Sequence, residues 1–149
     1  MSVFKRPIST YPTFGTLQYG SGYWEGTVEL EPLGGSFQVI VRATRDGPSD
    51  AQIAAMSRVM SDAASIKSAA SKEMVDVHEE SELLPSDLGS DADGIWRHLQ
   101  PSQVEVADES YYDDGRIAVL IIFESTQHGD FAPAIETADG SFVEVLSGT

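Results

Sequence analysis

The sequence predicts an α+β domain in which a mostly antiparallel sheet packs against one long helix. Three observations lead to this prediction. Apolar and polar residues alternate over 16–42, apolar residues recur every three or four positions over 49–84, and alternation returns from 104 onwards. We expect about six to seven strands, three before the helix and four after it, in a single domain spanning 1–149. Segment 1–12 is expected to be a poorly ordered tail.

The first three strands are predicted to form a meander. A short strand near Thr16–Tyr19 ends at a glycine-rich turn, the strand Tyr23–Leu30 follows, and Ser36–Arg42 completes the group. In the middle strand, apolar residues share one face and charged or polar residues share the other. This pattern is typical of a sheet that packs on the core with one face and contacts water with the other.

A long helix is predicted between Asp46-Gly47-Pro48 and Pro85. Ser49 or Asp50 can cap its N-terminus, and no glycine or proline interrupts it. Its apolar residues form a single stripe, and frequent alanines raise its intrinsic helicity and allow close approach to the sheet. The stripe consists of Ile53, Met56, Met60, Ala63, Ile66, Ala70, Met74 and Val77.

Segment 85–101 is rich in Ser, Asp and Gly around Trp96 and predicts a loop, after which alternation returns. We expect Asp113-Asp114-Gly115 to form a hairpin turn and Asp139-Gly140 to form a type I′ turn. The apolar run 118–123 predicts a central strand covered on both faces. The strands predicted in this half of the chain lie at 104–106, 117–123, 131–137 and 141–146.

The chain is strongly negative. Nine Lys and Arg against 24 Asp and Glu give a net charge of −15, and no Lys or Arg follows Arg116. Such a field repels nucleic acid and anionic membranes and attracts cationic partners. The chain has no cysteine, no apolar stretch long enough for a membrane span, and no apolar region of a secretory signal. We therefore expect a cytoplasmic protein that binds neither nucleic acid nor membrane.

The acids gather in the second half of the helix and in the loop after it. Eight of the 24 lie between Glu73 and Asp93. Because acids near a helix C-terminus oppose the helix dipole, folding gains nothing from this placement. Two interpretations remain open: a solvated face, or an interface for a basic protein partner with Trp96 as an aromatic anchor. The partner-binding residues of the second interpretation are Glu79, Glu80, Glu82, Asp87, Asp91, Asp93 and Trp96.

No catalytic or metal-binding motif in the sequence is strong, and we expect neither a metal nor a cofactor. The histidines have no metal-pair spacing, and the segment 91–94 lacks the first and last ligands of an EF-hand loop. An alternative function is a hydrolase-like enzyme that uses His128, Asp130 and Asp113 in one cleft. A second alternative is a nucleic-acid mimic, whose acids would line up along one surface at phosphate-like spacing. The oligomeric state is left open.

Short motifs near both ends of the chain add a family resemblance. Phe14-Gly15-x-Leu17 and Trp24-Glu25-Gly26-Thr27-Val28 open the chain, and a hairpin around Asp139-Gly140 followed by Gly148 closes it. With the central helix, these features resemble a group of small bacterial domains of unknown function, over nearly the whole chain. The resemblance implies the same architecture, and an immunity-type or accessory role. The leading hypothesis is therefore a non-enzymatic acidic protein that binds a cationic protein partner.

Overall fold

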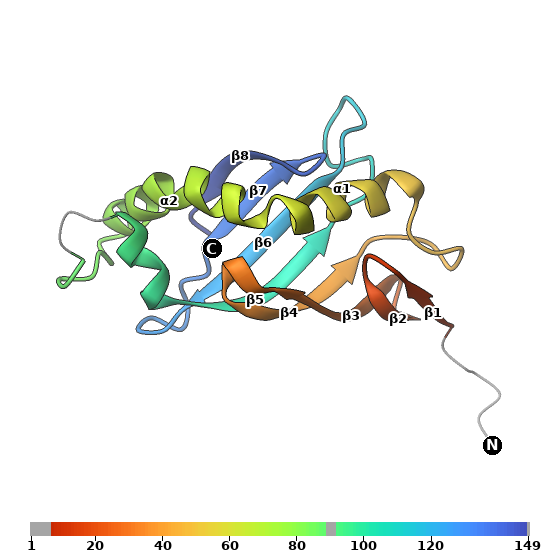
Figure 1. The fold of residues 1–149 in the computed structure, drawn as a ribbon, viewed down its shortest axis with the longest axis horizontal. Helices are drawn as coiled ribbons and strands as arrows, with labels where there is room; N and C mark the ends of the chain where they lie inside the picture. Colours follow the sequence, from red (N-terminus) through yellow and green to blue (C-terminus); the bar gives the residue numbers. More distant parts are fainter. Residues whose placement is uncertain (1–6, 89–91, 149) are drawn as a thin grey trace, which may run out of the picture.

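The computed structural model describes residues 7–88 and 92–148. They form one eight-stranded sheet with two helices on one of its faces (Figure 1). The helices are α1 (Asp50–Ser61) and α2 (Ala63–Glu80), and two short 3-10 segments are η1 (Glu31–Leu33) and η2 (Ala92–His98). The strands are β1 (Ile8–Tyr11), β2 (Gly15–Gly20), β3 (Tyr23–Leu30), β4 (Gly35–Val41), β5 (Leu99–Val106), β6 (Ala118–Ser125), β7 (Ala134–Ala138) and β8 (Ser141–Leu146).

The strands lie side by side in the order of the sequence. Neighbouring strands are antiparallel except for the central pair β4 and β5, which is parallel. Parallel strands need a crossover connection, and α1 and α2 supply it. The fold therefore consists of two antiparallel meanders joined side by side through a helical crossover, which confirms the predicted α+β class and mostly antiparallel sheet.

The structure has one strand more than predicted before the helices, and its helical segment is divided. β1 pairs with β2, so Ile8–Tyr11 is a strand where we expected part of a disordered tail. The single helix that was predicted divides into two at Asp62, whose φ of −105° and ψ of 13° depart from helical values. Backbone hydrogen bonds from Asp62 to Arg58 and from Ile66 to Asp62 continue across the break. As Figure 1 shows, α1 and α2 therefore follow one another along the sheet.

The two predicted turns of the second half have different outcomes. The type I′ turn at Asp139-Gly140 is confirmed, since both residues have positive φ, at 50° and 85°. The prediction that Asp113-Asp114-Gly115 alone joins two strands as a hairpin turn is wrong, because β5 ends at Val106 and β6 begins only at Ala118. The tight turn forms within a longer loop, where Gly115 N donates to Tyr112 O over 3.4 Å.

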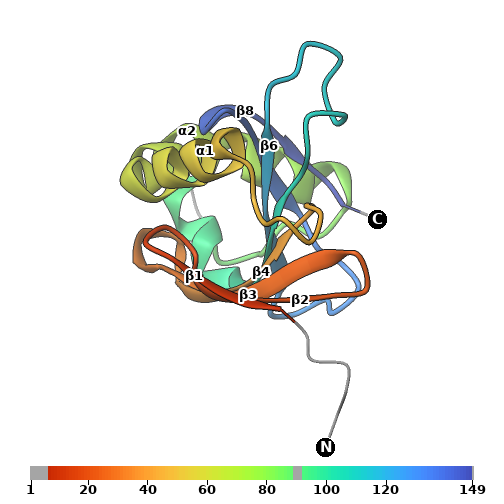
Figure 2. The same cartoon turned by 90° about the vertical axis from the view of Figure 1, so that its right-hand side faces the viewer.

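The core lies between the helices and the inner face of the sheet, which curls around them (Figure 2). Along β6, the alternate residues Val119, Ile121 and Phe123 belong to this core. The expectation that both faces of 118–123 are covered is confirmed only in part, because the helices cover one face and only Ala118 is buried on the other. Leu120 and Ile122 point away from the helices and stay partly exposed. We call the face of the sheet that points away from the helices the outer face.

Candidate functional site

The C-terminal end of α2 is capped around a glutamate in a left-handed conformation. Glu82 N donates to Glu79 O over 3.0 Å and Leu83 N donates to His78 O over 2.8 Å, which together form a Schellman motif. The φ of Glu82 is 59°. Glycine is the usual residue at this position, because a side chain there strains the backbone. This helix end therefore carries a glutamate at a conformational cost.

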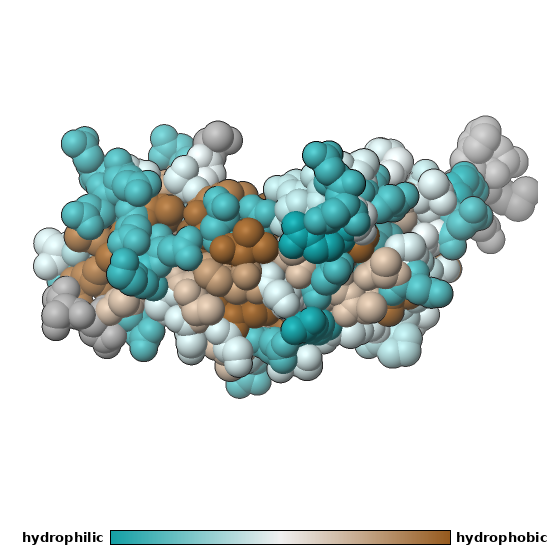
Figure 3. All heavy atoms as spheres, turned by 90° about the horizontal axis from the view of Figure 1, so that it is seen from above, coloured by the Kyte–Doolittle hydropathy of each residue, from teal (hydrophilic) through white to brown (hydrophobic). Residues whose placement is uncertain are grey.

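Exposed carboxylates surround this cap. Glu79 and Glu80 lie in the last turn of α2, and both are exposed, as is Glu82. Leu84 follows with 43% of its surface exposed, and the side chain of Asp87 is 69% exposed. In Figure 3, hydrophilic side chains stand beside apolar ones over this left-hand end of the molecule. We call Glu79, Glu80, Glu82, Leu84 and Asp87 the α2-end surface.

Glu73 and Asp93, two further acids of 73–93, lie on different flanks of α2. Glu73 Oε1 accepts a hydrogen bond from Val145 N of β8 over 3.2 Å. Asp93 lines a groove with Ser71 on another side of the helix. Ser71 and Glu73 are separated by about 200° around the helix axis, so the groove and the β8 contact lie on opposite flanks. Because Glu73 and Asp93 lie on opposite flanks, the described acids of the run do not form one continuous surface. Asp91 lies outside the described residues.

Trp96 is half-buried between α2 and the sheet. Its Nε1 donates to Ser71 Oγ over 2.9 Å, and its ring centroid lies 5.5 Å from that of Phe123. Lys67 Nζ lies 5.6 Å from the centroid of the ring. The remaining surface of Trp96 lines the same groove as Asp93. This groove has a volume of about 330 Å³. The indole therefore holds η2 against α2, on a different flank from the β8 contact of Glu73.

The structure does not bring together the three residues of the hydrolase alternative. His128 and Asp130 lie in the loop after β6, whereas Asp113 lies in the loop before it (Figure 1). β6 has eight residues. A strand of that length separates its two ends by about 23 Å. Asp113 therefore cannot share a cleft with His128 and Asp130.

Histidines from three segments converge instead near the α2-end surface, an arrangement that sequence spacing does not reveal. His78 Nδ1 lies 2.7 Å from Met74 O, and since a carbonyl only accepts, Nδ1 carries the hydrogen. The His78 ring packs edge-on against Phe131 at 4.8 Å. Burial lowers the pKa of His78, and nearby His98 and His128 lower it further. His98 Nε2 lies 3.1 Å from Asp87 Oδ1, outside hydrogen-bond alignment.

We predict that the protein loses stability as the pH falls from about 7 to 5. The pKa of His78 is lowered from its ordinary 6.5, so the unfolded chain binds this proton more readily than the folded chain does. The contribution of His78 to the free energy of unfolding is then constant above about pH 7.5 and falls as the pH drops through 6.5. Urea midpoints at pH 7.5 and 5.5 measure the loss. His78→Phe should lose less over this interval, and an equal loss in the variant would contradict the assignment.

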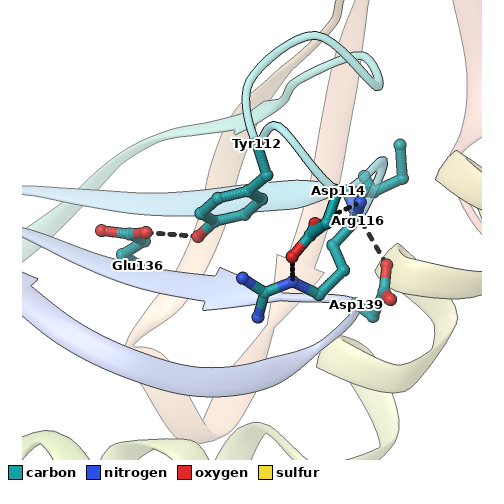
Figure 4. Close-up of polar contacts among 6 residues, drawn as sticks. Tyr112, Asp114, Arg116, Glu136 and Asp139 are labelled. Carbon is teal, nitrogen blue, oxygen red and sulfur yellow. Dashed lines mark hydrogen bonds and ion pairs between the residues drawn. The ribbon is translucent and has the colours of Figure 1, made fainter.

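A second polar cluster lies on the outer face (Figure 4). The Tyr112 hydroxyl donates to Oε2 of Glu136, a carboxylate that is only 8% exposed. The Arg116 guanidinium lies 4.7 Å from the Tyr112 ring centroid and donates to Asp114 over 2.8 Å. Burial raises the pKa of Tyr112 and the bond to Glu136 raises it further, so the phenol stays protonated. Sequence reasoning missed this cluster because we read the loop before β6 as turn residues only.

No protein-family model, curated protein or solved structure matches this chain. The resemblance to a group of small bacterial domains therefore stays a prediction. Within 7–88 and 92–148, no helix is long and apolar enough to cross a membrane. In the same described part of the chain, no three His, Asp or Glu side chains are grouped as metal ligands.

Proposed function

We propose that this chain is a non-enzymatic acidic binding protein whose α2-end surface engages a cationic protein partner. The observation that carries this proposal is the position of Glu82, which occupies a left-handed cap where glycine is more stable. Glu79 and Glu80 stand beside it and oppose the helix dipole. Both features lower the stability of the fold and place negative charge at one exposed end. Binding gives a physical reason to retain them.

The chemistry of the partner is argued from the charges and from Leu84. Among the described residues, the carboxylates of Glu79, Glu80 and Glu82 form no ion pair with Lys or Arg, whereas Glu105, Asp62, Asp76 and Asp114 do. These carboxylates therefore keep their negative field, which accelerates association with a basic surface. Exposed Leu84 offers an apolar contact beside them. A basic protein with an apolar residue inside its positive patch fits this surface.

The resemblance and the lack of cysteine support a more specific form of the proposal. Small acidic bacterial domains of the kind that this chain resembles suggest an immunity-type or accessory role. A chain without cysteine suits a reducing compartment. We therefore place this function in the bacterial cytoplasm.

The proposal is tested with the full chain as bait in its host, followed by affinity measurements on the protein that co-purifies. The double variant Glu79→Gln with Glu80→Gln should weaken binding by about tenfold or more at physiological salt. Glu82→Gly should weaken binding and raise the free energy of unfolding by about 1 kcal/mol, since glycine relieves the backbone strain. A folding defect cannot produce this combination.

The matched control for charge is Glu29→Gln with Glu31→Gln, which removes two exposed carboxylates from β3 and η1. It should leave the affinity within about twofold of wild type, because long-range charge effects are screened at physiological salt. If the control and the Glu79 and Glu80 variant weakened binding equally, the α2-end surface would not be the interface. Unchanged affinity in the Glu79 and Glu80 variant would have the same meaning.

A further inference from the structure

A continuous row of side chains crosses the outer face of the sheet. The strand registers place Glu105 opposite Leu120, Leu120 opposite Glu136, and Glu136 opposite Glu144. Directly paired residues on adjacent strands point to the same face. The half of the row from β5 to β8 therefore carries three carboxylates around one leucine. The whole row runs through Ile8, Gln18, Glu25, Ile40, Glu105, Leu120, Glu136 and Glu144.

The carboxylates on β7 and β8 repel one another. Glu136 and Glu144 form a direct cross-strand pair, which destabilises a sheet when the two charges are alike. Glu136 is 8% exposed, so solvent screens its charge less than that of a surface group. The sequence contains no Lys or Arg after Arg116, so neither strand supplies a cation. The hydroxyl of Tyr112 contacts Glu136 but brings no positive charge.

An exposed aromatic ring completes this surface. Tyr111 is 44% exposed and its ring packs edge-on against Tyr112, with 4.9 Å between centroids. Because the Tyr112 hydroxyl donates to Glu136, the Tyr111 ring packed on Tyr112 lies at the edge of the carboxylate row. Burial raises the pKa of Tyr111, and the charges of Glu136, Glu105 and Glu144 raise it further. Aromatic faces attract cations, most often the guanidinium of arginine. Arg116 already shows this contact, with its guanidinium over the Tyr112 ring.

We infer that Glu105, Tyr111, Leu120, Glu136 and Glu144 form an outer-face site for an arginine-bearing segment of a protein partner. A guanidinium binds carboxylates through paired hydrogen bonds and stacks on aromatic rings. The methylene groups of an arginine can pack on Leu120 while the head group reaches the carboxylates. Arg42 Nη2 lies 3.3 Å from Glu105 Oε1 and shows that this end of the row accepts a guanidinium.

This inference goes beyond the proposed function, because the site lies on the face of the sheet that the helices do not cover. The two surfaces can therefore be tested separately. The probe is the blocked peptide acetyl-Gly-Arg-Leu-Arg-Gly-amide, titrated into the full chain with methyl and aromatic NMR detection. Its comparison peptide replaces both arginines with citrulline, which has almost the same shape and no charge.

We expect saturable shifts of the Leu120 methyl and Tyr111 ring signals, with at least about tenfold weaker binding of the citrulline peptide. Glu144→Gln should weaken binding of the arginine peptide several-fold without lowering the melting temperature, because it also removes the repulsion of Glu136. Glu124→Gln, on the same face of β6, is the matched control and should leave the affinity unchanged.

Three results would overturn the inference. They are equal binding of the citrulline peptide, an unchanged affinity in Glu144→Gln, and shifts confined to Leu84 and its neighbours. The Glu79→Gln with Glu80→Gln variant separates the two proposals, because it should bind the arginine peptide as wild type does. If this variant no longer bound the protein partner but still bound the arginine peptide, the result would support the α2-end surface and the outer-face site as two independent binding sites.

Discussion

Gln52→Leu is expected to lower the free energy of unfolding by about 2 to 4 kcal/mol, through the loss of three hydrogen bonds made by a buried side chain. The Gln52 side chain is 2% exposed. Its Nε2 donates to Arg42 O over 2.8 Å and to Ala107 O over 3.0 Å, and its Oε1 accepts from Ser49 N over 2.9 Å. The two carbonyls follow the ends of β4 and β5. One amide therefore ties the start of α1 to the parallel strand pair.

Urea denaturation at pH 7.5 measures this effect, and two variants identify its cause. Gln38→Leu makes the same chemical change at an exposed position of β4 and should alter stability by less than about 0.5 kcal/mol. Gln52→Glu keeps the size of the side chain and its acceptor, but it sets a carboxylate against two carbonyls. It should destabilise the protein at least as much as leucine does. A loss below about 1 kcal/mol in both Gln52 variants would show that water replaces these bonds.

Gly140→Ala is expected to destabilise the protein by about 2 to 4 kcal/mol, the sum of left-handed backbone strain and a steric clash. The φ of Gly140 is +85°, and a Cβ atom there would lie 2.6 Å from Arg58 Cβ and 3.1 Å from Ala55 O. Both neighbours belong to α1, so the β7–β8 turn and the helix must move apart. The effect combines a local requirement of the turn with a tertiary one.

Gly115→Ala separates these two contributions. Gly115 has a φ of +82°, but a Cβ atom there would meet nothing within 4 Å. This variant should therefore lose only about 1 kcal/mol, the cost of the left-handed backbone alone. The difference in free energy of unfolding between the two variants measures the contact with α1. Equal losses would show that α1 yields to the extra methyl group without cost.

Local periodicity was enough to predict the elements that bury one face. The strands Tyr23–Leu30 and Ser141–Leu146 begin and end at the predicted residues. The predicted apolar stripe of the helix faces the core except at Met60, which is 37% exposed, whereas its neighbour Val59 is buried in the core. β1 was missed because four residues at a sheet edge show little alternation, and pairing with β2 makes them a strand. Loop 107–117 was read as a tight hairpin because an Asp-Gly pair indicates a turn without indicating where the strands end.

For the candidate sites too, the sequence predicted features that depend on neighbours along the chain and missed those that depend on the fold. The sequence predicts a concentration of acids between residues 73 and 93, but not that Glu73 turns to β8 while Asp93 turns to the groove of Trp96. The rotation of a helix by about 100° per residue separates neighbours in the chain. The outer-face site was missed for the opposite reason, because its carboxylates come from three different strands, β5, β7 and β8, that only the sheet register aligns.

By itself, the sequence determined the net charge, the periodicity of each element and the Asp139-Gly140 turn, because these depend on composition and on neighbours along the chain. Only the tertiary structure decided that the His78 ring packs against Phe131, and that Glu136 faces Glu144. Such contacts depend on strand order and register. A shift of one residue in the register would move every side chain of a strand to the other face.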